Sequence, residues 1–287
     1  MGFSGQYGGS TAATWKKVRE EWTGLLGDEA GGGNDGTPQP QTPPVQDQAP
    51  AALDAIGQAL AQALLEDCGK ATPSAALPLS AFLRRPRSHR GISDGASGGS
   101  GGATGSPSTA GRGGGRKGRQ AATQAGWGGA AIGAAVAYRE GDASALAAHG
   151  IRLEDLDGLS PRMKCAKLLD LILGDAGHPD EAAVRKASAE QVKKILNDAT
   201  PPTTLEALRD FIGEMTLQMG IVELKSQILG GESDAKRARS KERGLRQWIK
   251  AKIKNLNLGK YGTVTASQCY RAAQDMFRDA QRLLSEG

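Results

Sequence analysis

Aromatic side chains are scarce in this sequence, at 4 % of 287 residues, and the hydrophobic residues together reach only 38 %. Glycine, which adds no side chain to a core, is abundant instead, with 41 residues against a usual share of about 7 %. The length alone suits about two domains. Because so little of the chain can be buried, the composition argues against a pair of aromatic-rich enzyme domains. The net charge of +5 is only mildly basic.

Cysteine and long apolar runs are also lacking. The three cysteines, Cys68, Cys165 and Cys269, form no CxxC pair, which predicts reduced thiols and excludes a disulfide framework or a zinc knuckle. The longest uncharged, largely apolar stretch, residues 121–138, is interrupted by polar residues and glycines and falls short of the roughly 20 residues of a membrane span. The N-terminus has no apolar signal-peptide core. We therefore expect a cytoplasmic protein with no membrane partner.

The glycines are concentrated in two segments. From Gly95 to Gly118, 11 of 24 residues are glycine, and residues 27–50 combine glycine with proline. Such segments bury too little apolar surface to offset the entropy cost of ordering. We predict two disordered linkers, at residues 27–50 and 69–119.

Two short helices are expected outside the main domain. Residues 51–68 form an amphipathic helix and a candidate docking element, because leucine and isoleucine recur every three or four residues. The arm of residues 1–26 contains a second helix, in which Trp15 and Trp22 share one face. A short isolated helix with such a face needs a partner surface. That surface is either the C-terminal domain or another protein.

From residue 120 onward, helix signals follow one another with short breaks. Ser160 before Pro161 is typical of a helix start, and two further pairs fit the capping box, Ser188 with Gln191 and Thr203 with Glu206. No run shows the alternation of a half-buried strand. The sequence therefore predicts an all-α fold, with a single helical C-terminal domain (residues 120–287) preceded by long flexible arms rich in glycine, proline and arginine.

Residues that could carry chemistry are few. His89, His149 and His178 form no HxxxH pair and no acidic cluster accompanies them, so we predict neither a metal nor a cofactor. A nucleophilic dyad of Cys165 with His178 is conceivable in three dimensions, but Cys165 is more simply a small buried residue. The glycine-rich stretch 111–119 lacks the phosphate-loop signature. We expect a protein that is not an enzyme.

Positive charge is concentrated in two segments, residues 84–119 and 232–260, each of which carries a net charge of +7. In the second segment the candidate contacts to an anion or a nucleic acid are Lys236, Arg237, Arg239, Lys241 and Arg243. Such segments can neutralise phosphates with a steep dependence on salt. An acidic partner protein would suit them equally.

The order of the segments resembles one known family, the B component of the Qat anti-phage defence system. The opening MGFSGQYGGS is similar to the start of that family, and residues 110–141 resemble its Arg/Gly-rich entry into a small-residue helix. The chain departs from the family pattern at residues 12–15, so it resembles a divergent member.

Two further motifs support the resemblance. Asp180, Glu181 and Arg185 match the family's Asp-Glu-Ala-x-x-Arg-x-Ala helix, and residues 208–228 resemble its long C-terminal helix. An acidic first turn followed by an arginine is also ordinary helix chemistry.

The resemblance implies a non-enzymatic subunit that acts beside an ATPase, a TatD-like nuclease and a QueC-like enzyme. It further implies that the QueC-like enzyme adds a deazapurine to the N-terminal residue, here Gly2 after loss of Met1. Glycine offers an unhindered α-amine with a pKa near 8. The alternative function is a basic nucleic-acid-binding or phage-structural adaptor without modification.

Overall fold

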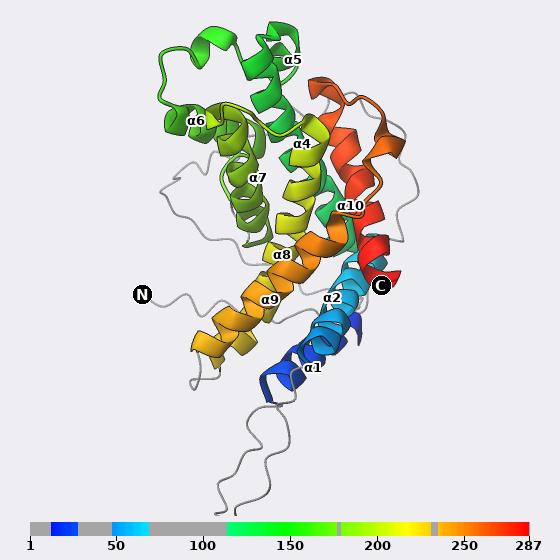
Figure 1. Cartoon of the computed structure of the whole chain (residues 1–287). Coiled ribbons are helices and arrows are strands. Elements are labelled where there is room, and N and C mark those ends of the chain that lie inside the picture. The colour runs from blue at the N-terminus through cyan, green and yellow to red at the C-terminus, as the bar shows by residue number, and fades with distance from the viewer. Residues whose placement is uncertain (1–12, 28–47, 69–113, 177–178, 231–234, 287) are drawn as a thin grey trace, which may run out of the picture.

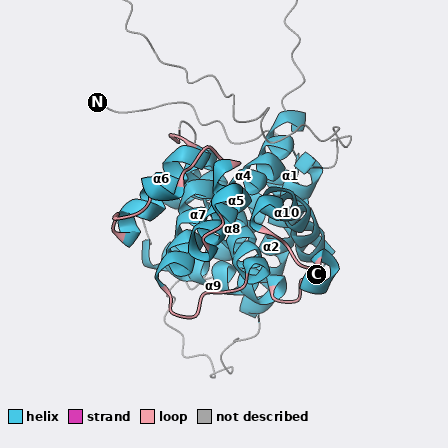
Figure 2. Ribbon diagram, turned by 90° about the horizontal axis from the view of Figure 1, so that it is seen from above, coloured by secondary structure: helices cyan, strands magenta, loops and turns pink. Residues whose placement is uncertain are grey.

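The computed structural model describes residues 13–27, 48–68, 114–176, 179–230 and 235–286 (Figure 1). Within these ranges no strand occurs, which confirms the predicted all-α fold (Figure 2). The helices are α1 (Ala13–Gly27), α2 (Gln48–Cys68), α4 (Gly114–Glu140), α5 (Ala143–Ala147), α6 (Pro161–Leu173), α7 (Pro179–Asn197), α8 (Thr204–Gly230), α9 (Ala235–Ile253) and α10 (Cys269–Glu286), with 3-10 turns η1 (Leu153–Asp155), η2 (Leu258–Tyr261) and η3 (Ala266–Gln268).

Residues 1–12, 28–47 and 69–113, which hold most of the predicted arms and linkers, lie outside the described residues. The last residues of both predicted linkers are helical in the structure. Helix α2 begins at Gln48 and α4 begins at Gly114, a few residues before the expected ends of the linkers.

Helix α4 lies at the centre of the bundle and packs against α2, α6, α7, α8 and α10. Its small residues allow this, because a side chain would not fit at several of its glycines. A Cβ atom at Gly129 would lie 2.5 Å from the carbonyl oxygen of Cys269, and one at Gly128 would lie 2.9 Å from Oγ of Ser188. The small-residue character of this stretch therefore determines how closely α7 and α10 approach α4.

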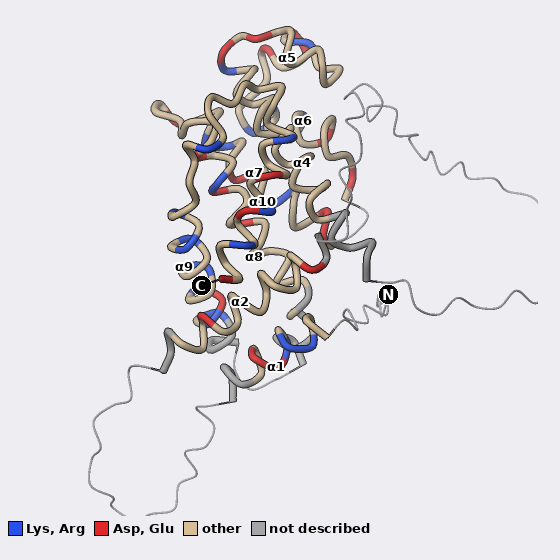
Figure 3. The backbone as a smooth tube through the Cα atoms, turned by 90° about the vertical axis from the view of Figure 1, so that its right-hand side faces the viewer, with Lys and Arg blue, Asp and Glu red and all other residues tan. Residues whose placement is uncertain are grey.

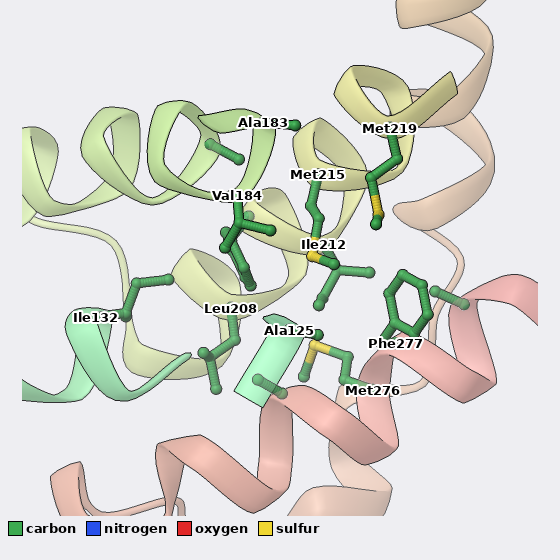
Figure 4. Close-up of a cluster of buried hydrophobic side chains, with 14 of the residues drawn as sticks. Ala125, Ile132, Ala183, Val184, Leu208, Ile212, Met215, Met219, Met276 and Phe277 are labelled. Carbon is green, nitrogen blue, oxygen red and sulfur yellow. The ribbon is translucent and has the colours of Figure 1, made fainter. Parts of the chain in front are cut away.

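The hydrophobic core lies between α4, α7, α8 and α10 (Figure 4). Helix α8 is buried on all sides between residues 211 and 220, and it contributes Phe211, Ile212 and Met215. Met276 and Phe277 of α10 approach from the other side and are also fully buried. Helix α8 therefore runs through the core, although it also buries the polar residues Glu214, Thr216 and Gln218.

Both N-terminal helices join this same core. Trp15 and Trp22 of α1 are 4 % and 1 % exposed, and α1 packs mainly on α2 with a smaller contact to α8. Helix α2 packs in turn against α4, α9 and α10. Leu60 of α2 lies over Gly220, where a Cβ atom would come within 2.8 Å of the leucine side chain. The face of α2 expected to dock is therefore covered within the chain, and the partner surface of the two tryptophans is the bundle itself.

The helix starts agree with the sequence at two of three predicted caps. Oγ of Ser160 accepts a hydrogen bond from the amide of Met163 at 3.4 Å. Thr203 and Glu206 form the predicted reciprocal capping box, with distances of 3.0 and 3.3 Å between backbone nitrogens and side-chain oxygens. The cap predicted at Ser188 is wrong: α7 runs without a break from Pro179 to Asn197. Ser188 is instead buried in mid-helix against α4, where a small side chain is required.

Candidate functional site

Helix α9 carries the basic segment predicted from the sequence. Its inner face is apolar: Leu245, Ile249 and Ile253 recur every four residues and are at most 2 % exposed. Four-residue spacing places side chains on one face of a helix. The polar residues of α9 are consequently turned outward or toward the edges of the bundle.

A row of exposed cations runs along the outer face of α9 and ends at the residue that follows the helix. We call it the α9 stripe: Arg239, Arg243, Lys250 and Lys254. None of the four forms an ion pair with an acid in the described part of the chain. From first to last they span about 22 Å of helix surface. Figure 3 shows the basic residues along α9 on the outside of the bundle. Lys241 is half-buried, and the side chains of Lys236 and Arg237 lie outside the described residues.

Other cations of the same segment are neutralised by acids of the bundle. Arg246 binds Glu214 at 2.6 Å and Glu242 at 3.2 Å, and Glu214 is only 2 % exposed. Burial disfavours the charged guanidinium, but the two carboxylates outweigh it and raise the pKa of Arg246. Lys252 lies 3.9 Å from Asp54 of α2. These pairs fix α9 to α8 and α2 and leave the α9 stripe as the unneutralised charge.

A small hollow of about 110 Å³ opens between α7, α8 and α9, and we call it the α7–α9 groove. Lys250 and Lys254 of the α9 stripe line one side, and Lys194 of α7 lines the other. Ligand pockets usually measure about 300–1,000 Å³, so the groove is sized for one small anion and not for a nucleotide. Lys194 was missed in the sequence because it lies outside both basic segments and joins the other lysines only through the fold.

The acids of the groove are largely engaged elsewhere. Glu214 is held by Arg246, and Asp210 pairs with Arg209 at 3.3 Å, which leaves Glu190 as the acid without a described ion-pair partner. Three lysines thus face one unpaired carboxylate. The electrostatic balance of the groove favours an anion.

A second and wider hollow, of about 380 Å³, lies between the end of α4 and the α7–α8 connection. Its arginine, Arg139, donates hydrogen bonds to the carbonyls of Ile195 at 2.6 Å and of Asp198 at 2.8 Å. The charge of Arg139 is therefore used to hold the connection in place.

The family-like motif has a structural role in this fold. Asp180 and Glu181 occupy the first turn of α7, where carboxylates complement the helix dipole. Arg185 donates to the carbonyl of Gly174 at 2.8 Å and forms an ion pair with Asp170. Arg185 thereby ties α7 to the end of α6.

The cysteines and histidines offer little reactivity where the structure describes them. Burial raises the pKa of the Cys165 thiol, and it raises that of Cys269 to about 12. Burial also lowers the pKa of His149, which keeps the ring neutral. His89 and His178 lie outside the described residues, so the conceivable Cys165–His178 dyad stays an untested prediction.

Three further findings bear on the kind of site. In the described residues no group of three or more His, Cys, Asp or Glu side chains could hold a metal ion. None of the described helices is both long and apolar enough to cross a membrane. Gly2, the predicted modification acceptor, lies outside the described residues.

Comparison with known proteins gives one match. The sequence pattern of the family described as "Qat anti-phage system associated protein QatB" matches residues 113–284, which is more than half of the chain and runs from α4 into α10. No curated protein and no solved structure matches the chain. The match leaves out α1, α2 and the N-terminal segment. It includes the central helix, the α7–α9 groove and the α9 stripe, and on its extent the chain belongs to the QatB family of the Qat anti-phage defence system.

Proposed function

We propose that the protein is a non-enzymatic subunit of the Qat system whose N-terminal glycine, Gly2, is modified by a QueC-like enzyme. As a member of the QatB family the chain is a component of this defence system, which implies partner proteins within it. The proposed partners are the QueC-like enzyme, an ATPase and a TatD-like nuclease, with the protein working in the cytoplasm.

The observation that carries the proposal is the anchoring of α1 directly after the N-terminal segment. Trp15 and Trp22 are buried against the bundle, so the start of α1 at Ala13 is fixed on the bundle. Fully extended, twelve residues reach about 40 Å. The segment has four glycines, Gly2, Gly5, Gly8 and Gly9, and its aromatic side chains are Phe3 and Tyr7. Such a tether suits delivery of an α-amine into the active site of a separate enzyme.

The chemistry of the step is an acyl transfer. QueC-like enzymes use ATP to adenylate the carboxylate of a deazapurine, with release of pyrophosphate. The unprotonated α-amine of Gly2 would attack the activated carbonyl carbon, form an amide, and release AMP and a proton. An α-amine with a pKa near 8 is unprotonated in an appreciable fraction at neutral pH. The amide would add a planar, hydrogen-bonding group at the end of the segment.

The non-enzymatic part of the proposal is supported by the state of the thiols. Nucleophilic cysteines need a lowered pKa and access to solvent. Cys165 and Cys269 are at most 3 % exposed, and burial raises the pKa of both thiols. In this proposal the bundle is a scaffold for assembly and for presentation of the N-terminus.

Phage plating on cells that carry the complete operon tests the role of Gly2. Gly2→Glu puts a large residue after the initiator methionine, which is then retained, and we expect protection against phage to be lost. Gly5→Glu is the matched control, because it makes the same change three residues later and leaves Met1-Gly2 intact. Full protection with Gly2→Glu would refute the proposal, as would equal loss with both variants.

A pull-down tests the subunit role separately. The tagged full-length chain is expected to retain the QueC-like enzyme from cells that express the operon, and Gly2→Glu is expected to retain it as well if the bundle makes the main contact. Failure of the unmodified chain to retain any neighbouring gene product would contradict the role as a subunit.

A further inference from the structure

We propose that the α9 stripe and the α7–α9 groove together bind the phosphate backbone of a nucleic acid. The surface consists of Lys194 of α7, Arg239, Arg243 and Lys250 of α9, and Lys254 directly after the end of α9. This inference does not depend on modification of Gly2, because it concerns side chains of the helical bundle and a different chemistry.

The cations of this surface are not neutralised by the described acids of the bundle. The acids of this region are used inside the bundle: Glu214 is bound to Arg246, Asp210 to Arg209, and Asp54 lies near Lys252. The five cations of the surface have no ion-pair partner among the described residues. Cations that line one face repel one another, and an anion bound between them relieves that repulsion. At the groove, lysines from two helices lie around a hollow large enough for one phosphate group.

The length and shape of the surface favour a polymer. The four exposed cations of the α9 stripe extend over about 22 Å, which is far longer than a single small anion. Helix α9 runs along the outside of the bundle (Figures 1 and 3), and its cations Arg239, Arg243 and Lys250 are exposed, so a strand can lie along it. One phosphate seated in the groove would fix the position of the strand on the helix.

The absence of apolar anchors on α9 favours nucleic acid over an acidic protein. Stable protein interfaces have a buried core of aromatic or aliphatic side chains. In the described part of the chain the large hydrophobic side chains that are exposed are Met163 and Leu171, both on α6. The aromatic residue of α9, Trp248, packs against Gly57 and donates a hydrogen bond to Asp54, so its ring is not free for stacking on bases. The surface is therefore suited to backbone phosphates, without reading of sequence.

Fluorescence anisotropy with the full-length chain and a labelled DNA duplex of about 30 base pairs tests the proposal, with the single strand as a second probe. Binding is expected at about 50 mM salt and should weaken steeply by about 200 mM. Lys250→Glu with Lys254→Glu should lower the affinity at least about tenfold and reduce the salt slope by about two. Lys250→Gln with Lys254→Gln should show the same direction with a smaller loss.

The matched control is Arg162→Glu with Arg271→Glu. Both arginines are exposed, neither has a described ion-pair partner, and they lie on α6 and α10, away from the groove. This double variant changes the net charge by the same amount and should alter the affinity less than about twofold. Circular dichroism confirms that each variant is folded.

Three results would overturn the proposal: no binding to either probe at low salt, an equal loss of affinity in the groove and control variants, or tighter binding of a polyglutamate peptide than of DNA. The second result would assign binding to net charge alone. The third would assign the surface to an acidic protein partner.

Discussion

Substitution of Gly133 by alanine tests the packing of α4 most directly. A Cβ atom at this position would overlap the carbonyl oxygen of Ala266 in η3 and lie 3.0 Å from Cβ of Cys269. The main obstacle is backbone, which cannot rotate away, so the cost should lie near the upper end of the range for overpacked cores, about 3 kcal/mol. Alanine in a helix recovers about 1 kcal/mol relative to glycine. We expect a net loss of about 2 kcal/mol in the free energy of unfolding.

Gly213→Ala in α8 is the matched control. Its Cβ atom would lie 3.5 Å from Cδ1 of Ile253 and 3.9 Å from Cγ2 of Ile249, which is ordinary contact. The helix-propensity gain should therefore remain, and stability should rise by up to about 1 kcal/mol. Urea unfolding followed by circular dichroism measures both variants. If Gly133→Ala were as stable as Gly213→Ala, the close approach of α4, η3 and α10 would be refuted.

Three further predictions concern buried polar and ionisable groups. Arg246→Met leaves the carboxylate of Glu214 buried without its main partner and should cost about 3 kcal/mol in urea unfolding. Burial lowers the pKa of His149 below 6.5, so stability should be highest above pH 6.5 and should decline as the pH falls below it, because the unfolded chain then binds the proton first. Cys165 and Cys269 are buried, so at most one of the three cysteines should react with a thiol reagent before unfolding.

Two of these predictions have a control variant, and the third has a direct contradicting result. Arg243→Met, on the exposed face of α9, should change stability by less than about 0.5 kcal/mol. His149→Gln should remove part of the decline below pH 6.5, and an unchanged pH profile would show that His149 is not its source. Rapid labelling of two or more thiols in the folded protein would contradict their burial.

Local signals in the sequence predicted much of the secondary structure. The sequence correctly predicted the helix start at Ser160-Pro161 and the capping box of Thr203 with Glu206. Both predictions succeed because a cap depends on neighbours within three residues. The same rule failed at Ser188, where the packing of α7 against Gly128 of α4 accounts for the small residue. A local pattern cannot distinguish these two uses of a serine.

The arrangement of the candidate surface could be predicted only in part. The charge of α9 is plain in the sequence, but its division into paired and unpaired cations depends on acids from α2 and α8, such as Asp54 and Glu214. Lys194 joins the groove from α7 for the same reason. The burial of α1 and α2 in the common core is likewise a tertiary effect, set by fits such as Leu60 against Gly220.

The intact mass of the full-length chain tests the central claim most directly. The chain is expressed with and without the QueC-like enzyme of its operon, and the N-terminal peptide is sequenced by mass spectrometry. We predict that co-expression adds the mass of one deazapurine acyl group to Gly2, that the chain expressed alone shows only the loss of Met1, and that Gly2→Glu abolishes the addition. An N-terminal peptide that shows nothing beyond methionine loss under co-expression would contradict the account.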